Sequence, residues 1–291
     1  MAMTGTPEIE GRALDPTREA SGPHAAASDD DRAVGIWLLA VCAMIFAMAV
    51  IGAITRLTES GLSIMEWAPV RGILPPMSDE EWRRVFALYQ EIPEYREMNA
   101  GMTLGEFKTI FWWEYVHRLW GRLIGVVFAV PFVVFLIRGK IRRALMPHLV
   151  AMFVLGGLQG LLGWYMVASG FADRTDVSQY RLVAHLSAAV AIYGYVLWVA
   201  FGLLVPAPDV GRDPRVGRLR SGLVVVLVLV AATIASGGFV AGLNAGFTYN
   251  TFPLMDGDLV PDGYADLRPW WLNVFEKRPA DIREDRLQER P

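Results

Sequence analysis

The stretch that decides the fold is Phe-Trp-Trp-Glu-Tyr-Val-His-Arg-Leu-Trp-Gly-Arg, residues 111–122, which opens the second long apolar run. It places Glu114 and His117 in the first turns of a predicted membrane helix, where ionisable groups are costly and therefore suggest function. Because the two residues stand three apart, they share one helix face, and Gly121 removes a side chain one turn further along. Two interpretations of His117 stay open: a haem ligand, or a histidine hydrogen-bonded to a neighbouring helix.

Five apolar runs are long enough to cross roughly 30 Å of hydrocarbon. The second contains His117, Arg118 and Arg122, whereas the other four contain no Asp, Glu, Lys or Arg. The sequence therefore predicts an all-α polytopic membrane protein with five spans, at about residues 34–55, 112–137, 149–170, 182–205 and 221–243.

These spans predict one complete four-helix transmembrane bundle and part of a second. The front half covers 33–205 and includes a periplasmic loop at 56–111, and the incomplete second half covers 221–275 with its one span and an outer loop. The polar ends at 1–32 and 276–291 are rich in charged residues and are predicted to be disordered tails. No cleavable signal precedes the first span, which is expected to remain as an anchor.

Charge and cysteine content exclude several functions. The net charge of -3 is distributed among loops rather than in a basic patch, so nucleic-acid binding has no support. Cys42 is the only cysteine, which excludes an internal disulfide, a dithiol centre and a cysteine-ligated cluster.

Loop charge predicts the orientation. The loops at 138–148 and 206–220 each carry four Lys or Arg residues, while the loop at 169–180 carries only Arg174. Basic loops face the cytoplasm, so the N-terminus is expected inside and the segment 56–111 outside. In that segment, capping-box patterns at Ser78 with Glu81 and at Thr103 with Glu106 predict helix starts.

A second histidine pairs with the first. Spans two and four run in the same direction, so His117 and His185 are expected at similar depth on parallel helices, where they could coordinate a haem iron from opposite faces. Zinc is disfavoured because no further Cys or His is near. His24 in the tail and His148 in an inner loop are not expected to be ligands.

Helix-packing residues are also visible. Gly238 and Gly242 form a small-xxx-small pair, which predicts a close approach of two helices. Gln159 is a polar residue at mid-membrane, which we interpret as an interhelical hydrogen-bonding group rather than a catalytic one.

The end of span one is repeated at the end of span five. Gly52-Ala-Ile-Thr-Arg-Leu-Thr-Glu-Ser-Gly-Leu-Ser aligns with Gly237-Gly-Phe-Val-Ala-Gly-Leu-Asn-Ala-Gly-Phe-Thr, and proline and glycine residues follow both copies. Duplicated halves are common in membrane bundles. The second copy continues to Trp270-Trp271 and then into the charged tail.

With these motifs, the chain resembles the haem A synthase family, of the alphaproteobacterial and mitochondrial type, over about residues 32–275. The matching motifs are Thr55-Arg-Leu-Thr-Glu-Ser-Gly-Leu-Ser-Ile with Glu66-Trp67, the stretch 111–122, Ala184-His185-Leu186, and Ala245-Gly-Phe-Thr-Tyr-Asn-Thr-Phe-Pro-Leu-Met-Asp-Gly. Members have eight spans in two halves, each half with a histidine pair. This sequence has neither the last spans nor their histidines, so we interpret it as a C-terminally truncated or frameshifted member.

The resemblance implies the site. His117 and His185 would be the axial ligands of the substrate haem iron, and Glu114 would be the catalytic carboxylate beside the reacting methyl. Possible partners of the haem propionates are Arg118, Arg122, Arg56 and Arg71. The family's haem b cofactor belongs to the back half, so no second-haem ligands are present and at most one haem is expected.

The implied reaction converts haem O to haem A by oxidising a ring methyl to a formyl group, for supply to cytochrome oxidase. Implied partners are haem O, haem O synthase, an electron acceptor, membrane lipid and a possible homo-oligomer, in the bacterial inner membrane. Two other interpretations stay open: a bis-histidine b-type cytochrome that carries electrons, and an inactive truncated family member. A carboxylate beside the ligand helix favours the enzyme over the cytochrome, and the polar tail favours the inactive form.

Overall fold

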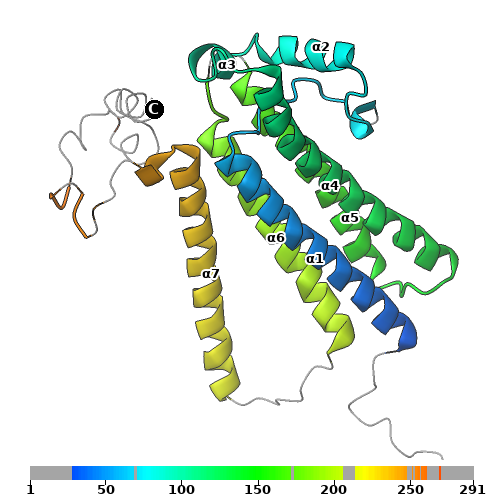
Figure 1. Cartoon of the computed structure of the whole chain (residues 1–291). Helices are drawn as coiled ribbons and strands as arrows, with labels where there is room; N and C mark the ends of the chain where they lie inside the picture. Colours follow the sequence, from blue (N-terminus) through cyan, green and yellow to red (C-terminus); the bar gives the residue numbers. More distant parts are fainter. Residues whose placement is uncertain are drawn as a thin grey trace, which may run out of the picture.

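Five helices of the computed structural model are long and apolar enough to cross a membrane. They are α1 (Asp29–Leu57), α4 (Leu104–Ile137), α5 (Met146–Val167), α6 (Gln179–Leu204) and α7 (Pro214–Gly242) (Figure 1). The structure describes residues 28–68, 71–171, 174–205 and 214–247, together with 251, 253–255, 257–260 and 269. Within these residues, the prediction of an all-α protein with five candidate membrane spans is confirmed.

Helix α1 begins inside the segment predicted as a disordered tail. The hydroxyl of Ser28 caps the helix by accepting a hydrogen bond from the Asp31 N–H at 3.1 Å. Three aspartates in the first turn are favourable next to the positive end of the helix dipole. The prediction of a tail over 1–32 is therefore wrong for its last residues, and the remainder of that tail, like the tail at 276–291, lies outside the described residues.

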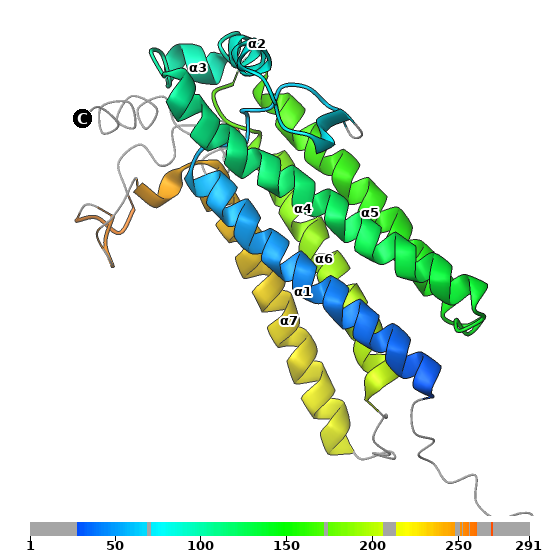
Figure 2. The same cartoon turned by 45° about the vertical axis from the view of Figure 1, so that its right-hand side comes forward.

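Helices α2 (Asp79–Tyr89) and α3 (Pro93–Glu97) lie across one end of the bundle, which we call the capped end (Figures 1 and 2). Both predicted capping boxes are confirmed, one at the start of α2 and one at the start of α4. The second box lets α4 begin at Leu104, ahead of the apolar span predicted from residue 112. A buried aromatic cluster joins α2 to α4 and includes Trp82, Tyr89, Phe107 and Phe111.

The opposite end is held by a second buried cluster, to which α1, α4, α5 and α6 all contribute. Trp37 of α1 packs against Phe128 and Phe135, with ring centroids 5.0 and 5.6 Å away. Pro131 lies inside α4 and cannot donate the helical hydrogen bond to the Val127 carbonyl. The indole N–H of Trp37 donates to that carbonyl at 2.8 Å, so α1 supplies the hydrogen bond that the proline removes.

Helix α1 packs on α4 and α6, while α5 and α7 pack on α6. Figure 2 shows α4 and α5 running side by side, with α7 on the other side of α1 and α6. Two glycines bring α7 close to α6: a Cβ at Gly238 would lie 3.0 Å from Val183, and one at Gly242 would lie 2.8 Å from Gln179. The close approach predicted for this glycine pair is confirmed.

The repeated segments share a backbone turn. Glu59 and Asn244 hold equivalent positions in the two aligned copies and have left-handed φ angles of 50° and 53°. Arg56 and Ala241 are also equivalent, and they meet in space, because Arg56 Nη2 donates to the Ala241 carbonyl at 2.7 Å. Most of the second copy beyond residue 247 lies outside the described residues.

Candidate functional site

His117 lies on α4 where this helix packs against α1. A Cβ at Gly52 would come within 3.1 Å of His117 Cε1, so glycine allows the imidazole to lie directly on the α1 backbone. Thr55, one turn further along α1, places its Oγ1 3.5 Å from His117 Nδ1 and donates to the Ile51 carbonyl at 2.9 Å. Helix α1 therefore provides both the surface behind the ring and the polar neighbour of one ring nitrogen.

His185 has a matching setting between α6 and α5. A Cβ at Gly163 would lie 3.0 Å from His185 Cε1. Gln159, one turn earlier on α5, places its Nε2 3.1 Å from His185 Nδ1 and 2.9 Å from the His185 carbonyl oxygen. The predicted interhelical role of Gln159 is confirmed, and its partner is the candidate ligand itself.

The two imidazoles lie at the level between the two hydrophobic clusters. Helices α4 and α6 run in the same direction from the capped end (Figure 1). A glycine-backed imidazole on each of two parallel helices fits a planar porphyrin, which takes one axial nitrogen on each face of its iron.

The Glu114 carboxylate is 3% exposed, and it faces the segment after α1. Its Oε2 accepts hydrogen bonds from the Ser63 hydroxyl and the Ile64 N–H, both at 2.7 Å. Its Oε1 accepts from Arg118 Nε at 2.9 Å and from Arg118 Nη2. Because every one of these partners is a donor, the arrangement suits an ionised carboxylate that is fixed in position.

Two of the candidate propionate partners, Arg118 and Arg122, hold the segment after α1 against α4. Arg118 donates to the carbonyls of Ile64 at 2.6 Å and Glu66 at 3.1 Å, and Arg122 donates to the Ala68 carbonyl at 3.2 Å. The structure thus brings Arg118 together with Glu114, a pairing that the sequence analysis did not anticipate.

Arg56 and Arg71 have different surroundings. Arg56 forms an ion pair with Asp176 at 3.4 Å and a hydrogen bond with the Asn244 side chain, linking α1 to the segment before α6 and to the turn after α7. Arg71 is exposed in the short helix η2 (Arg71–Ile73). All four candidate arginines lie toward the capped end.

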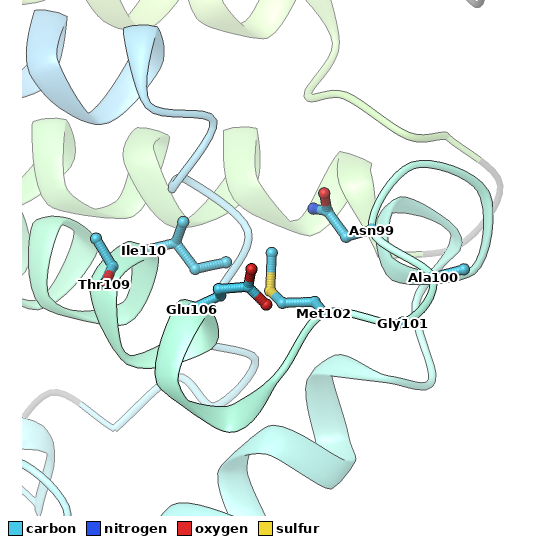
Figure 3. A pocket seen from close by; sticks show the side chains of 7 residues that line it. All are labelled: Asn99, Ala100, Gly101, Met102, Glu106, Thr109 and Ile110. Carbon is cyan, nitrogen blue, oxygen red and sulfur yellow. The ribbon is translucent and has the colours of Figure 1, made fainter. Parts of the chain in front are cut away.

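Two hollows flank this region. One, of about 260 Å³, lies between α5 and α6 and is lined by apolar residues together with Gln159 and Tyr195. The other, of about 540 Å³, lies at the capped end and is lined by the loop 99–102 and by Glu106, Thr109 and Ile110 of α4 (Figure 3). The lining of the second hollow includes neither histidine nor Glu114, so we assign it no part in the site.

The glycines behind the two imidazoles were missed in the sequence analysis, which considered Gly121 instead. At Gly121 the nearest side-chain atom is Met48 Cε, 3.4 Å from where a Cβ would be. A signal for the correct glycines was present, because Gly52 with Thr55, and Gly163 with Gln159, each put a glycine and a polar residue one turn apart.

Among the described residues, no three His, Cys, Asp or Glu side chains gather to hold a bare metal ion. The fold and site define a polytopic helical membrane protein with a pair of glycine-backed histidines beside a buried, arginine-paired carboxylate. Residues 35–280 match the cytochrome oxidase assembly protein family, and the chain belongs to that family.

Among its relatives is a protein named heme A synthase from Rhodospirillum centenum, which is 55% identical over 90% of this chain and 69% of its own length. A heme A synthase from Parvibaculum lavamentivorans is 51% identical over 84% of this chain and 70% of its own. Another, from Agrobacterium fabrum, is 51% identical over 85% of this chain and 67% of its own. No solved structure matches the chain.

Proposed function

We propose that this protein is a haem A synthase-like oxidoreductase, which oxidises a ring methyl of haem O to the formyl group of haem A. The observation that carries the proposal is the matched setting of His117 and His185, each lying on a glycine of the preceding span. The names of relatives at about half identity support the substrate. These names favour the enzyme over an electron-carrying cytochrome.

In this proposal, His117 and His185 hold the substrate haem iron from opposite faces. The glycine behind each ring fixes the imidazole plane, so the orientation of each ligand is set by the neighbouring helix before haem arrives. The sequence contains two other histidines, His24 and His148, and His148 Nδ1 lies 2.7 Å from the Tyr195 hydroxyl. Of the four histidines, His117 and His185 are therefore the pair that we propose for the substrate haem.

Glu114 provides a fixed negative charge near the reacting edge of the ring. Arg118 and the donors at residues 63 and 64 hold the carboxylate in one orientation, so it can stabilise positive charge that develops as the methyl carbon is oxidised. In this arrangement Arg118 is committed to Glu114. Arg56 and Arg122 also have partners within the protein, whereas Arg71 is exposed, and all four stay candidate partners of the haem propionates.

The reaction requires a partner for its electrons. Oxidation of a methyl to a formyl group through successive hydroxylations and loss of water consumes one water overall and releases four electrons and four protons. An electron acceptor must take these electrons, and a haem O synthase is the class of enzyme that supplies the substrate. We place the protein in the bacterial inner membrane, with its N-terminus in the cytoplasm.

The test is haem binding and haem O conversion by the purified full chain in lipid. His117→Ala and His185→Ala should each lose the low-spin haem spectrum and the conversion, while His148→Ala, a histidine away from the site, should keep both. Low-spin haem that persists undiminished in both site variants would overturn the proposed ligands.

A further inference from the structure

The segment after α1 runs back alongside α4, so that part of it lies at the depth of a membrane span. Arg122 Nη2 donates to the Ala68 carbonyl at 3.2 Å, and the Tyr115 hydroxyl donates to the Ile73 carbonyl at 2.6 Å. Both donors belong to the second predicted span, so the residues that they hold lie beside the first turns of that span. We call the described part of this stretch the returning segment, residues 64–68 and 71–74.

The returning segment has its backbone polar groups satisfied by α4. Irregular backbone at membrane depth is stable only where the protein supplies such partners, and residues 64–68 are in neither a helix nor a strand. Arg118 donates to the carbonyls of Ile64 at 2.6 Å and Glu66 at 3.1 Å, and the Ile64 N–H donates to the Glu114 carboxylate at 2.7 Å. The arginines that interrupt the second apolar run therefore bond the carbonyls of a neighbouring stretch of chain.

The side chains of the returning segment are apolar where they are exposed to the surroundings of α4 and α5. Trp67 is 50% exposed, Ile73 47% and Leu74 73%. The ring centroid of Trp67 lies 6.1 Å from that of Trp164, which is one turn before the end of α5. The exposed apolar surface is therefore continuous with the sides of two membrane spans, at the level where tryptophan is enriched in membrane proteins.

The charged residues of this region are compatible with a position at the lipid headgroups. Glu66 forms a two-point ion pair with Arg84 of α2, with both N–O distances at 2.9 Å, which lowers the cost of placing its carboxylate near lipid. Arg71 is exposed, and its long side chain can reach lipid phosphates. Pro75 and Pro76, which follow the segment, have no N–H that would need a partner.

We propose that the returning segment docks into the bilayer, with Trp67, Ile73 and Leu74 inserted between the headgroups and acyl chains of the leaflet at the capped end. The partner is lipid because this surface continues along two spans whose surroundings are lipid, and because its carbonyls already have donors within the protein. The inference goes beyond the proposed function and does not depend on haem, so either can fail without the other.

Spin labelling of the full chain in vesicles of phosphatidylcholine and phosphatidylglycerol measures the depth of the segment. In a Cys42→Ala background, one nitroxide is attached at Leu74→Cys, at Val126→Cys on the exposed side of α4, or at Glu80→Cys on α2. Accessibility to oxygen, which concentrates in the bilayer, is compared with accessibility to a water-soluble nickel chelate. The ratio of oxygen to nickel accessibility at Leu74 should exceed that at Glu80 several-fold, as the ratio at Val126 should. A ratio at Leu74 equal to that at Glu80 would overturn the proposal.

A photo-reactive side chain identifies what covers the segment. Ile73 is replaced by p-benzoylphenylalanine in the full chain, which is irradiated in the same vesicles and studied by mass spectrometry. We expect adducts with lipid acyl chains, and several-fold fewer such adducts when the same replacement is made at the exposed Glu80 of α2. Cross-links between two copies of the chain in place of lipid adducts would mean that a second copy covers this surface, and the proposal would be wrong.

Discussion

Each candidate ligand is positioned by a glycine on the preceding membrane span. The imidazole of His117 lies on Gly52 and that of His185 on Gly163, and in both places a Cβ would meet the ring at Cε1. This contact fixes the ring more firmly than a hydrogen bond alone, because it leaves no space on one side. The two settings are alike in sterics and differ in the polar neighbour of Nδ1, which is Thr55 at His117 and Gln159 at His185.

The glycine contact predicts the effect of a single methyl group. Gly163→Ala should displace the His185 ring at a cost of about 1–3 kcal/mol, which lowers haem affinity by about tenfold or more. The control is Gly160→Ala on the same helix, where no atom lies within 4 Å of an added Cβ. Haem titration followed by absorbance checks both, and equal affinity in the two variants would contradict the contact.

Glu114 should matter more to chemistry than to haem retention, because its hydrogen bonds go to Arg118 and to residues 63 and 64 rather than to either histidine. Glu114→Gln is expected to keep haem bound and to lower haem O conversion by about tenfold or more. The variant should also unfold more easily, since Arg118 loses a buried partner, at a cost of about 3–5 kcal/mol. Product analysis and haem content are measured on the same sample.

The exposed Glu80→Gln on α2 is the matched control for Glu114→Gln and should change neither quantity. If Glu114→Gln loses bound haem and haem O conversion in the same proportion, Glu114 is a structural residue instead.

At the scale of helices, local patterns were predictable, and so was the presence of interhelical contacts at Gly238, Gly242 and Gln159, but the partners in such contacts were not. The capping boxes at Ser78 and Thr103 depend on residues three apart, and the five spans depend on apolar runs, so both could be read from the sequence. The pairing of Arg118 with Glu114 depends on the path of the segment after α1. The glycines behind the imidazoles likewise depend on which helices become neighbours, which one sequence does not specify.

The hydrogen bond from Trp37 to the Val127 carbonyl predicts that substitutions at Trp37 and Pro131 have coupled effects on stability. Trp37→Phe leaves the Val127 carbonyl without a donor and should destabilise the protein by about 1–3 kcal/mol. In a Pro131→Ala background, the backbone N–H at position 131 can donate to the Val127 carbonyl. Trp37→Phe should then cost only a small fraction of that free energy. Denaturation in detergent is measured for the unaltered protein, the two single variants and the double variant, and it gives the coupling free energy between the two positions. An equal cost of Trp37→Phe in the two backgrounds would contradict the prediction.

The capped end should respond to pH through Glu94. This carboxyl is 6% exposed, and burial raises its pKa to about 8, while the hydrogen bond from the Tyr89 hydroxyl at 2.8 Å acts in the opposite direction. Nearby acidic groups at Asp176, Glu114 and Glu59 raise the pKa further. The folded protein therefore keeps a proton that the unfolded chain has already lost, so stability falls as pH rises from about 5 to about 8 and then levels off.

Hydrogen exchange at α2 and α3 across that pH range checks this prediction. Protection should fall with pH in the unaltered protein and change much less in Glu94→Gln, which cannot ionise. A pH profile that is the same in the two proteins would assign the effect to another group.

At the scale of the whole molecule, the polar features are sorted between two ends. The capped end carries α2, α3, the Glu114 network and the candidate arginines, whereas the opposite end carries the loop between α4 and α5 with four basic residues at 138, 140, 142 and 143. Lys140 and Arg142 there pair with Asp30 and Asp31 at the start of α1, at 2.7 Å each. The candidate site therefore lies nearer the end without the basic loop.

This asymmetry predicts the orientation in the membrane. Basic loops stay in the cytoplasm, so the capped end and its site should face the periplasm. Cys42 is the only cysteine and is 4% exposed, so the unaltered protein should react little with a membrane-impermeant maleimide and can serve as the background. Glu80→Cys on α2 should be labelled in intact spheroplasts, and Arg143→Cys only after the membrane is permeabilised. The reverse pattern would place the site on the cytoplasmic side, where haem O would have to enter from the other face and the argument from loop charge would be wrong.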